Sequence, residues 1–322
     1  MKNRTYIKDL KDHIGKDATI AGWIDVRRDQ GKMIFFDFRD MSGKVQGVIL
    51  PQNTEVLSVG EKVRPEWVVE VKGKVNKRPE KMINENEENG DIEIEILELK
   101  VINEAETPVF DIHSDGHEIN EETRLKYKYL DLRRPRLQKN IRNRSKVLKF
   151  IRDYLTGEGF VEIETPILTK SSPEGARDYV VPSRVERGKF YALPQSPQQY
   201  KQLLMVSGME KYFQLPKVMR DEDTRGDRQP EFTQLDVEMS FMSQEEILDI
   251  TEDMFTKLVK EIYPEKKITK EPWPRLDYDE VMEKYGTDSP DLRKDKNDPN
   301  ELAFAWILNF PLFENEKENG NY

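Results

Sequence analysis

The residues from Arg220 to Glu238 carry the side chains best suited to binding a nucleotide. The segment reads RDEDTRGDRQPEFTQLDVE, with arginines and carboxylates around one glycine, then an aromatic residue and a strand-like run. Two strands joined by a charged loop would place Arg220 and Glu222 on one arm and Phe232, Gln234 and Asp236 on the other. Such a hairpin offers a guanidinium for a phosphate, a carboxylate for an exocyclic amine and an aromatic face for a base. The alternative interpretation is a solvated hairpin held together by salt bridges.

Two stretches upstream hold further candidates for binding a small anion. They read SSPEGARDYVVPSR from Ser171 and YALPQSPQQYKQLLM from Tyr191. The prolines of the second stretch predict a helix that begins near Gln198, with Lys201 in its first turn, where unpaired backbone amides and side-chain donors converge on an anion. From the residues alone, a lysine at the position of Lys201 is more often a surface residue than a ligand contact, and Glu174 is equally explained as a turn residue.

The order of these residue types resembles the second signature motif of class II aminoacyl-tRNA synthetases, and closely that of the bacterial-type aspartyl-tRNA synthetases, a subclass b family. The two upstream stretches are similar to the same family. The resemblance implies that ATP is bound by five residues of the hairpin: Arg220, Asp221, Glu222, Gln229 and Phe232. It also implies a catalytic role for Arg220, which would touch both the substrate carboxylate and the α-phosphate.

The resemblance further implies an aspartate site made of Glu174, Gln198, Lys201, Arg220 and Asp236. Glu174 would bind the amino group, and Lys201 would meet the side-chain carboxylate. Because the neutral amide of asparagine would leave this lysine unpaired, the lysine would also carry the amino-acid specificity.

The implied reaction is a two-step ligation that needs no protein nucleophile. The α-carboxylate of aspartate attacks the α-phosphorus of ATP, and the terminal ribose hydroxyl of a tRNA then takes the aspartyl group. Rate enhancement would come from alignment and from cations beside the phosphorus. We expect Mg²⁺ to accompany the triphosphate.

The elements ahead of these segments alternate in the manner of β-strands. Five strand-like runs cover residues 19–26, 33–39, 44–50, 67–75 and 91–96, and a polar loop covers 84–90. Five short strands with glycines at bends predict a closed barrel of the oligonucleotide-binding (OB) type over residues 1–107.

The second run predicts an outward-facing aromatic residue by parity. If Ile34, Phe36 and Phe38 point inward, Phe35 points outward, where it could stack on an unpaired base or be covered by a loop. The run GWIDVRRDQGKMIFFDFRD resembles the anticodon-binding barrel of the same family. It implies anticodon contacts by Arg28, Phe35, Gln46 and Glu93, although the register of residues 92–99 is open. Gln30 departs from the family pattern, which leaves open whether the partner is the aspartate tRNA alone or also the asparagine tRNA.

The remaining elements connect and complete these sites. Residues 108–135, which include RLKYKYLDLRRP, match the family's hinge. An amphipathic helix over about 137–156 has a predicted buried face of Leu137, Ile141, Leu148, Ile151 and Leu155, and it lies in a run with nine Lys or Arg and no acid from Arg133 to Arg152. This basic side is either solvated or in contact with RNA. A strand over 160–165 follows, and the helix and strand resemble the family's first motif, which implies a homodimer.

Composition narrows the chemistry. The 322 residues include no cysteine, which excludes disulfides and thiolate chemistry, and the three histidines precede residue 118. The net charge of −10 argues against a general polyanion binder. Neither a membrane-spanning run nor a signal-peptide pattern is recognisable, so we expect a cytoplasmic protein.

The chain departs from the family at its C-terminal side. The glycine-rich third motif, the catalytic-domain histidine and the metal-binding acids have no counterpart, and the domain inserted in bacterial members is missing. We therefore expect an α+β chain with a barrel (1–107), a hinge (108–135) and an incomplete class II catalytic domain (136–322), an antiparallel sheet flanked by helices that does not aminoacylate tRNA alone. Metal ligands are expected beyond Tyr322. The competing hypotheses are a non-catalytic RNA-binding paralogue and a related asparaginyl- or lysyl-tRNA synthetase.

Overall fold

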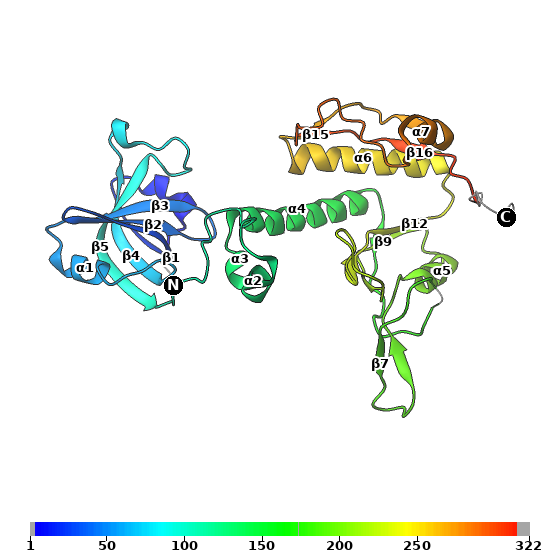
Figure 1. The fold of residues 1–322 in the computed structure, drawn as a ribbon, viewed down its shortest axis with the longest axis horizontal. Helices are drawn as coiled ribbons and strands as arrows, with labels where there is room; N and C mark the ends of the chain where they lie inside the picture. Colours follow the sequence, from blue (N-terminus) through cyan, green and yellow to red (C-terminus); the bar gives the residue numbers. More distant parts are fainter. Residues whose placement is uncertain (1–3, 173, 314–322) are drawn as a thin grey trace. The chain divides into compact units, whose positions relative to one another are not determined.

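Five strands close into a barrel near the start of the chain (Figure 1). The computed structural model describes residues 4–172 and 174–313, and the chain divides by its contacts into two units, Met1–Gln138 and Lys139–Tyr322. The barrel strands are β1 (Asp17–Gln30), β2 (Met33–Arg39), β3 (Lys44–Ile49), β4 (Val68–Lys77) and β5 (Ile92–Asn103), in the order β1-β2-β3-β5-β4. The predicted five-stranded barrel is confirmed, and β1 and β5 run further than the sequence indicated.

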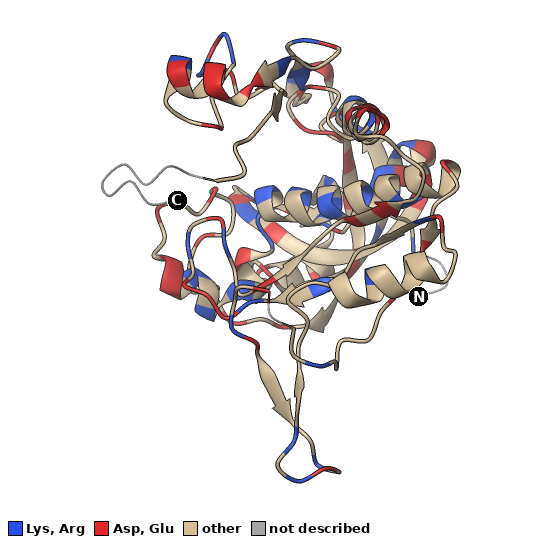
Figure 2. Cartoon of the chain, turned by 90° about the vertical axis from the view of Figure 1, so that its right-hand side faces the viewer, with Lys and Arg blue, Asp and Glu red and all other residues tan. Residues whose placement is uncertain are grey.

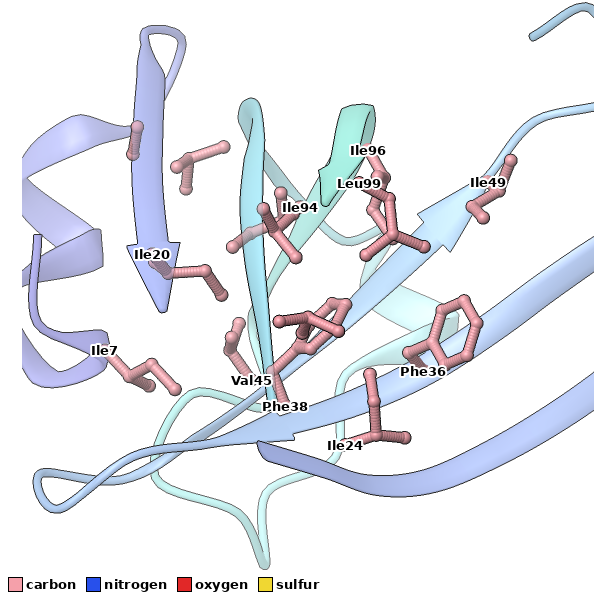
Figure 3. Packing of buried hydrophobic residues seen from close by; sticks show 14 of the residues in the cluster. Ile7, Ile20, Ile24, Phe36, Phe38, Val45, Ile49, Ile94, Ile96 and Leu99 are labelled. Carbon is pink, nitrogen blue, oxygen red and sulfur yellow. The ribbon is translucent and has the colours of Figure 1, made fainter. Parts of the chain in front are cut away.

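Alternation of apolar residues explains how the barrel closes. Ile34, Phe36 and Phe38 on β2 are buried, whereas Phe35 between them is only partly buried. Side chains from the other strands meet them in the interior (Figure 3). The short helix η1 (Ile7–His13) adds two fully buried residues to the same core. The barrel also includes α1 (Thr54–Gly60) and η2 (Glu80–Met82).

A bulge between β4 and β5 settles the register that the sequence left open. Gly73 lies opposite Ile96 and Lys72 lies opposite Glu98, so Leu97 is the extra residue. Up to the bulge β5 keeps strict alternation, which puts Glu93 beside Gln46 of β3.

The segment after the barrel is ordered by buried charge. It contains α2 (Glu121–Lys126) and α3 (Lys128–Asp131). Asp131 and Arg134 are fully buried and joined at 2.9 Å, and the Arg134 guanidinium also donates to the Ser114 carbonyl at 2.8 Å. A side chain on Gly116 would lie 2.6 Å from Arg134, so only glycine fits there. By its contacts this segment belongs to the first unit.

The second unit is organised around α4 (Pro135–Gly157) and α6 (Gln244–Ile262). Ile151 and Leu155 of α4 pack with Met254 and Leu258 of α6 over Phe213 of the small sheet β12-β9-β6. Its strands are β6 (Val161–Glu162), β9 (Lys211–Gln214) and β12 (Asp236–Met239), with β9 antiparallel to β12 and parallel to β6.

Shorter elements complete this unit. They are β7 (Val180–Pro182), β8 (Phe190–Ala192), α5 (Gln198–Val206), β10 (Lys217–Met219), β11 (Glu231–Thr233), β13 (Lys267–Ile268), β14 (Arg275–Asp277), α7 (Tyr278–Tyr285), β15 (Glu301–Leu302) and β16 (Trp306–Leu308). The β7–β8 hairpin has uncharged strands and a charged tip (Figure 2). Throughout residues 4–172 and 174–313, the helices are too short or too polar to span a bilayer.

Three details differ from the sequence predictions. Ile141 on α4 is 52% exposed, so the buried face of this helix begins only in its second half. The strand expected over 160–165 is limited to Val161–Glu162. The run 232–238 forms two strands, because β11 pairs with β10 and β12 pairs with β9, so Asp236 does not lie on an arm of the hairpin.

Candidate nucleotide site and nucleic-acid interface

The hairpin β10–β11 positions the candidate nucleotide-binding side chains. Val218 faces Phe232 across the two strands, and the Arg220 amide donates to the Pro230 carbonyl at 2.9 Å, which extends the pairing by one step. The Arg220 guanidinium lies 5.4 Å from the centre of the Phe232 ring. This cation–π contact places a fixed positive group at the face of an aromatic ring.

A cleft of about 780 Å³ opens beside this hairpin. Its lining residues are Arg144, Lys217, Arg220, Glu222, Asp223, Asp227, Arg228, Gln229, Pro230, Glu231, Phe232 and Thr233. The volume is that of a pocket for a small molecule of nucleotide size. The cleft thus brings together four of the five residues predicted to bind ATP, namely Arg220, Glu222, Gln229 and Phe232. The fifth, Asp221, is not among the lining residues, and its amide pairs with the Arg177 carbonyl at 3.1 Å.

Three cations of this cleft were missed by sequence reasoning. Arg144 reaches it from α4, where its guanidinium donates to Thr233 Oγ1 at 3.0 Å, and Lys217 and Arg228 come from the hairpin itself. The basic run of residues 133–152 contained the signal for Arg144, which we had assigned to solvent or RNA. Lys217 is paired with Glu231 at 2.8 Å. The lining holds as many carboxylates as cations, so its net charge does not favour an anion. Binding of a phosphate would instead depend on which guanidinium and ammonium groups point into the cleft.

Lys201, in the first turn of α5, is held by two carboxylates of β12. Its ammonium lies 2.7 Å from Asp236 Oδ1 and 2.7 Å from Glu238 Oε1. Burial lowers the pKa of Lys201, but the two carboxylates outweigh it and the net pKa is raised. Burial raises the pKa of Asp236, and the hydrogen bond from Lys201 offsets this only in part. Glu238 was not predicted, although it lies two residues after Asp236 and therefore on the same face of the strand.

Buried polar atoms surround this lysine. Asp236 faces Gln214 and Glu238 faces Tyr212 across β9 and β12. Among the described residues, Asp236 Oδ2, Gln214 Oε1 and the Tyr212 hydroxyl have no hydrogen-bond partner. Two of these atoms are acceptors, which suits a ligand that brings a hydrogen-bond donor such as an ammonium group.

The other two residues predicted to contact the amino acid, Glu174 and Gln198, lie on segments next to the buried side chain of Gln195. Glu174 accepts from the Ser172 hydroxyl at 3.2 Å, and Gln198 begins α5. The Gln195 side-chain amide donates to the Ala176 carbonyl at 2.9 Å, and the Gln195 backbone carbonyl accepts from Arg220 Nε at 3.4 Å. Gln195, which sequence reasoning missed, therefore links the Glu174 stretch to the hairpin.

Arg220 and Lys201 were expected to face one shared cavity. The described lining of the 780 Å³ cleft includes Arg220 but not Glu174, Gln198, Lys201 or Asp236. The lysine points to Asp236 and Glu238 instead, because these carboxylates are the nearest anions. The structure thus gives two groups of residues, the cleft that contains Arg220 and the cluster of Lys201, Asp236 and Glu238. Gln195 connects Arg220 to the stretch that holds Glu174.

The barrel brings together all four residues predicted to contact an anticodon. Arg28, Phe35, Gln46 and Glu93 come from the neighbouring strands β1, β2, β3 and β5. Phe35 faces outward, as its parity predicted, and lies opposite Arg28. Arg28 Nη2 donates to Gln46 Oε1 at 3.2 Å, and Gln46 Nε2 donates to Glu93 Oε2 at 3.2 Å. An aromatic face beside amide and charged groups is the composition that binds unpaired bases.

Metal ligands do not gather in the part of the chain that the structure describes. No group of three or more His, Asp or Glu side chains there is arranged to hold an ion.

Comparison with known proteins finds two family matches along the chain. Residues 120–319 match the family described as tRNA synthetases class II (D, K and N), and residues 18–102 match the OB-fold nucleic acid binding domain. An aspartate–tRNA(Asp/Asn) ligase of Rubrobacter xylanophilus is 50% identical over 310 residues, which are 96% of this chain and 51% of that protein. An aspartate–tRNA ligase of Staphylococcus haemolyticus is 48% identical over 321 residues, 99% of this chain and 54% of that protein. The chain spans about half the length of the curated relatives it matches.

Solved structures agree with this assignment. The asparaginyl-tRNA synthetase of Pyrococcus horikoshii, in complex with asparaginyl-adenylate, matches with a TM-score of 0.76 at 25% identity, over 90% of this chain and 69% of that one. A putative aspartyl-tRNA synthetase of Leishmania major matches with a TM-score of 0.69 at 26% identity, over 88% of this chain and 59% of that one.

Proposed function

The chain belongs to the class II tRNA synthetases for aspartate, lysine and asparagine, and from this premise we propose that it forms the nucleotide-, aspartate- and anticodon-binding parts of an aspartate–tRNA ligase. The observation that carries the proposal is the hairpin face on which Arg220 and Phe232 are stacked at the wall of a cleft of nucleotide size. Relatives of about 50% identity with this named activity support the choice of aspartate.

In the proposed first step, the aspartate α-carboxylate attacks the α-phosphorus of ATP and pyrophosphate leaves. Arg220 stabilises the negative charge that develops between the two reactants, while Phe232 stacks on the adenine ring and Glu222 accepts from its exocyclic amine. Gln229 and Asp221 border the nucleotide. The first step leaves aspartyl-adenylate. The terminal ribose hydroxyl of the tRNA then takes the aspartyl group, the bond between the acyl group and the phosphate breaks, and AMP leaves.

Binding of the amino acid falls to the residues around Lys201. An ammonium has three N–H donors, and two of them are used by Asp236 and Glu238. The third remains for the side-chain carboxylate of aspartate. Glu174 and Asp236 would receive the amino group, and Gln198 would contact the substrate from the start of α5. Magnesium would enter as the counter-ion of the triphosphate, and we assign no step to it.

The proposed organisation follows from these roles. Residues 1–107 form the anticodon-binding domain, 108–135 the hinge and 136–322 the class II catalytic part. The partner is the aspartate tRNA, the assembly is a homodimer and the location is the cytoplasm.

Calorimetry tests the proposal directly. ATP and L-aspartate should each bind to the 322-residue chain. Arg220→Ala should weaken ATP binding by at least about tenfold, since a charge-assisted bidentate contact is lost, and Lys201→Ala should do the same to aspartate. Arg293→Ala, which removes an exposed arginine paired with Asp291, is the matched control. Absence of binding of both ligands, or equal losses in the control, would contradict the proposal.

A further inference from the structure

The outer face of the barrel carries a continuous chain of polar contacts that extends beyond the four predicted anticodon residues. It begins at Asp37 of β2, whose carboxylate oxygens accept from both terminal nitrogens of Arg28 at 2.6 and 2.7 Å. It continues from Arg28 to Gln46 and from Gln46 to Glu93, each at 3.2 Å. Neither the sequence nor the comparisons assign a role to Asp37.

This chain fixes which way the Gln46 amide points. Its oxygen accepts from a guanidinium on one side, and its nitrogen donates to a carboxylate on the other. A flipped amide would set donor against donor and acceptor against acceptor. Gln46 therefore presents its remaining hydrogen and its remaining lone pair in a fixed order.

The fixed order depends on the position of Arg28, and Asp37 sets that position. Arg28 is 40% exposed, and a long side chain with that much access to solvent would sample many rotamers on its own. The planar fork of a bidentate guanidinium–carboxylate pair allows essentially one arrangement. Asp37 also lies directly opposite Gln46 in the β2–β3 register, so the fork holds Arg28 at the amide. The hydrogen bonds that Arg28 donates to Asp37 are also the main cause of the raised pKa of Arg28.

We propose that Asp37 is a specificity-determining positioning residue for an unpaired RNA base: through Arg28 it orients the Gln46 amide that meets the base edge beside Phe35. Asp37 does not itself read the base. The inference rests on the proposed anticodon-binding role of the barrel, and it adds that discrimination between bases depends on a carboxylate which touches no RNA.

The test measures discrimination rather than affinity alone. The 322-residue chain is titrated with a fluorescent RNA hairpin that carries the aspartate anticodon in its loop, and with hairpins in which each anticodon base is changed in turn. Asp37→Asn should reduce the ratio of the affinities for the matched and the most strongly rejected hairpin by about tenfold. This is a part of the discrimination between bases that one well-oriented base contact supplies. Affinity for the rejected hairpin should change by less than about twofold, because the phosphate contacts are intact.

Two further variants make the result decisive. Arg28→Lys keeps the charge but cannot form the fork, so it should lose the same discrimination, and it carries the test if Asp37→Asn fails to fold by circular dichroism. Glu98→Gln is the matched control, since it removes a carboxylate paired with Lys72 on an exposed part of the barrel. The inference would be overturned, without affecting the proposed function, if both test variants kept the wild-type ratio of affinities or lost affinity equally for every hairpin. Failure of the wild-type chain to bind any hairpin would overturn the proposed function and the inference with it.

Discussion

The two carboxylates that hold Lys201 determine what its ammonium can do for a substrate. Asp236 and Glu238 together outweigh its single positive charge, so the lysine acts as an oriented donor within a cage of net charge −1. An oriented donor alone can serve either a carboxylate or an amide oxygen. Under the proposed function, selection of aspartate over asparagine would therefore depend on Asp236 and Glu238 as well as on Lys201.

Removal of this lysine should destabilise the second unit. Lys201→Ala leaves two largely buried carboxylates beside each other without a cation, and we expect the free energy of unfolding to fall by about 2 kcal/mol. The measurement is urea denaturation followed by tryptophan fluorescence. Lys260→Ala is the matched control, because its partner Glu271 and the lysine itself are both well exposed, and it should cost less than about 0.5 kcal/mol. Equal losses in the two variants would show that the cage does not hold the fold together.

Sequence reasoning found part of this site and missed the rest for a definable reason. Arg220, Glu222 and Phe232 lie within one short hairpin, where local spacing determines their neighbours. Glu238 and Arg144 become part of a site only through elements distant in sequence: Glu238 contacts Lys201 of α5, and Arg144 of α4 contacts Thr233 of β11. Residue types and spacing do not show which helix will lie over a given face of a strand.

At the scale of elements, the alternation of apolar residues predicts the strands of the barrel better than those of the second unit. The alternation of β2 predicted both its existence and its inward face, because a half-buried strand needs no other information. The run from Phe232 to Glu238 has an equally strand-like composition, yet it is divided between β11 and β12, which pair with different partners. Pairing partners are a property of the fold, so the division was not predictable.

Close approach of β1 and β2 should make Gly22 indispensable. A Cβ at this position would lie 2.2 Å from the Arg39 carbonyl oxygen, and the backbone of a closed barrel cannot easily move away. Gly22→Ala should lower the free energy of unfolding by about 3 kcal/mol, measured by thermal unfolding with circular dichroism. Gly157→Ala is the control, since a Cβ there meets nothing within 4 Å. A loss below about 1 kcal/mol for Gly22→Ala would refute the argument.

Acid should weaken the barrel through Asp25, which connects three strands. This buried carboxylate on β1 accepts from Arg39 of β2 and Lys44 of β3, and His113 lies 3.9 Å away. Burial raises its pKa, but the hydrogen bonds and charges of Lys44 and Arg39 lower it by more, so the folded pKa lies below the ordinary 3.8. The contribution to stability is therefore complete above pH 3.8 and is lost as the pH falls through the lower, folded pKa.

The measurement for Asp25 is stability against pH. The wild-type chain should lose stability steadily below about pH 4, and Asp25→Asn should show a shallower decline over the same range while being less stable at neutral pH by about 1 kcal/mol. Parallel curves for the two proteins would show that Asp25 is not responsible for the acid sensitivity.

At the scale of the whole molecule, the two units are built in different ways. The first has long strands around one core, and a hinge segment whose Arg133 pairs with the buried Glu66 of the barrel. The second has strands of two to four residues and keeps large apolar side chains in solvent, such as Phe241 at 91% and Val206 at 86%. The sequence indicated a boundary near residue 108, whereas the contacts divide the chain after Gln138, because the segment 108–135 also contacts the barrel, as Arg133 does through Glu66.

This construction predicts that residues 1–138 fold by themselves and that the hinge segment contributes to their stability. Glu66, which is buried, is paired with Arg39 of the barrel and also with Arg133 of the hinge segment. A fragment of residues 1–107 keeps the barrel core but leaves Glu66 with one cation instead of two. We expect both fragments to unfold cooperatively in urea, with 1–107 less stable by about 2 kcal/mol. Arg133→Ala within 1–138 should reproduce most of that difference, whereas the same change at Lys126, which is not paired with Glu66, should not. Equal stability of the two fragments would show that the hinge segment only rests on the barrel, and an unfolded 1–138 fragment would show that the barrel depends on the rest of the chain.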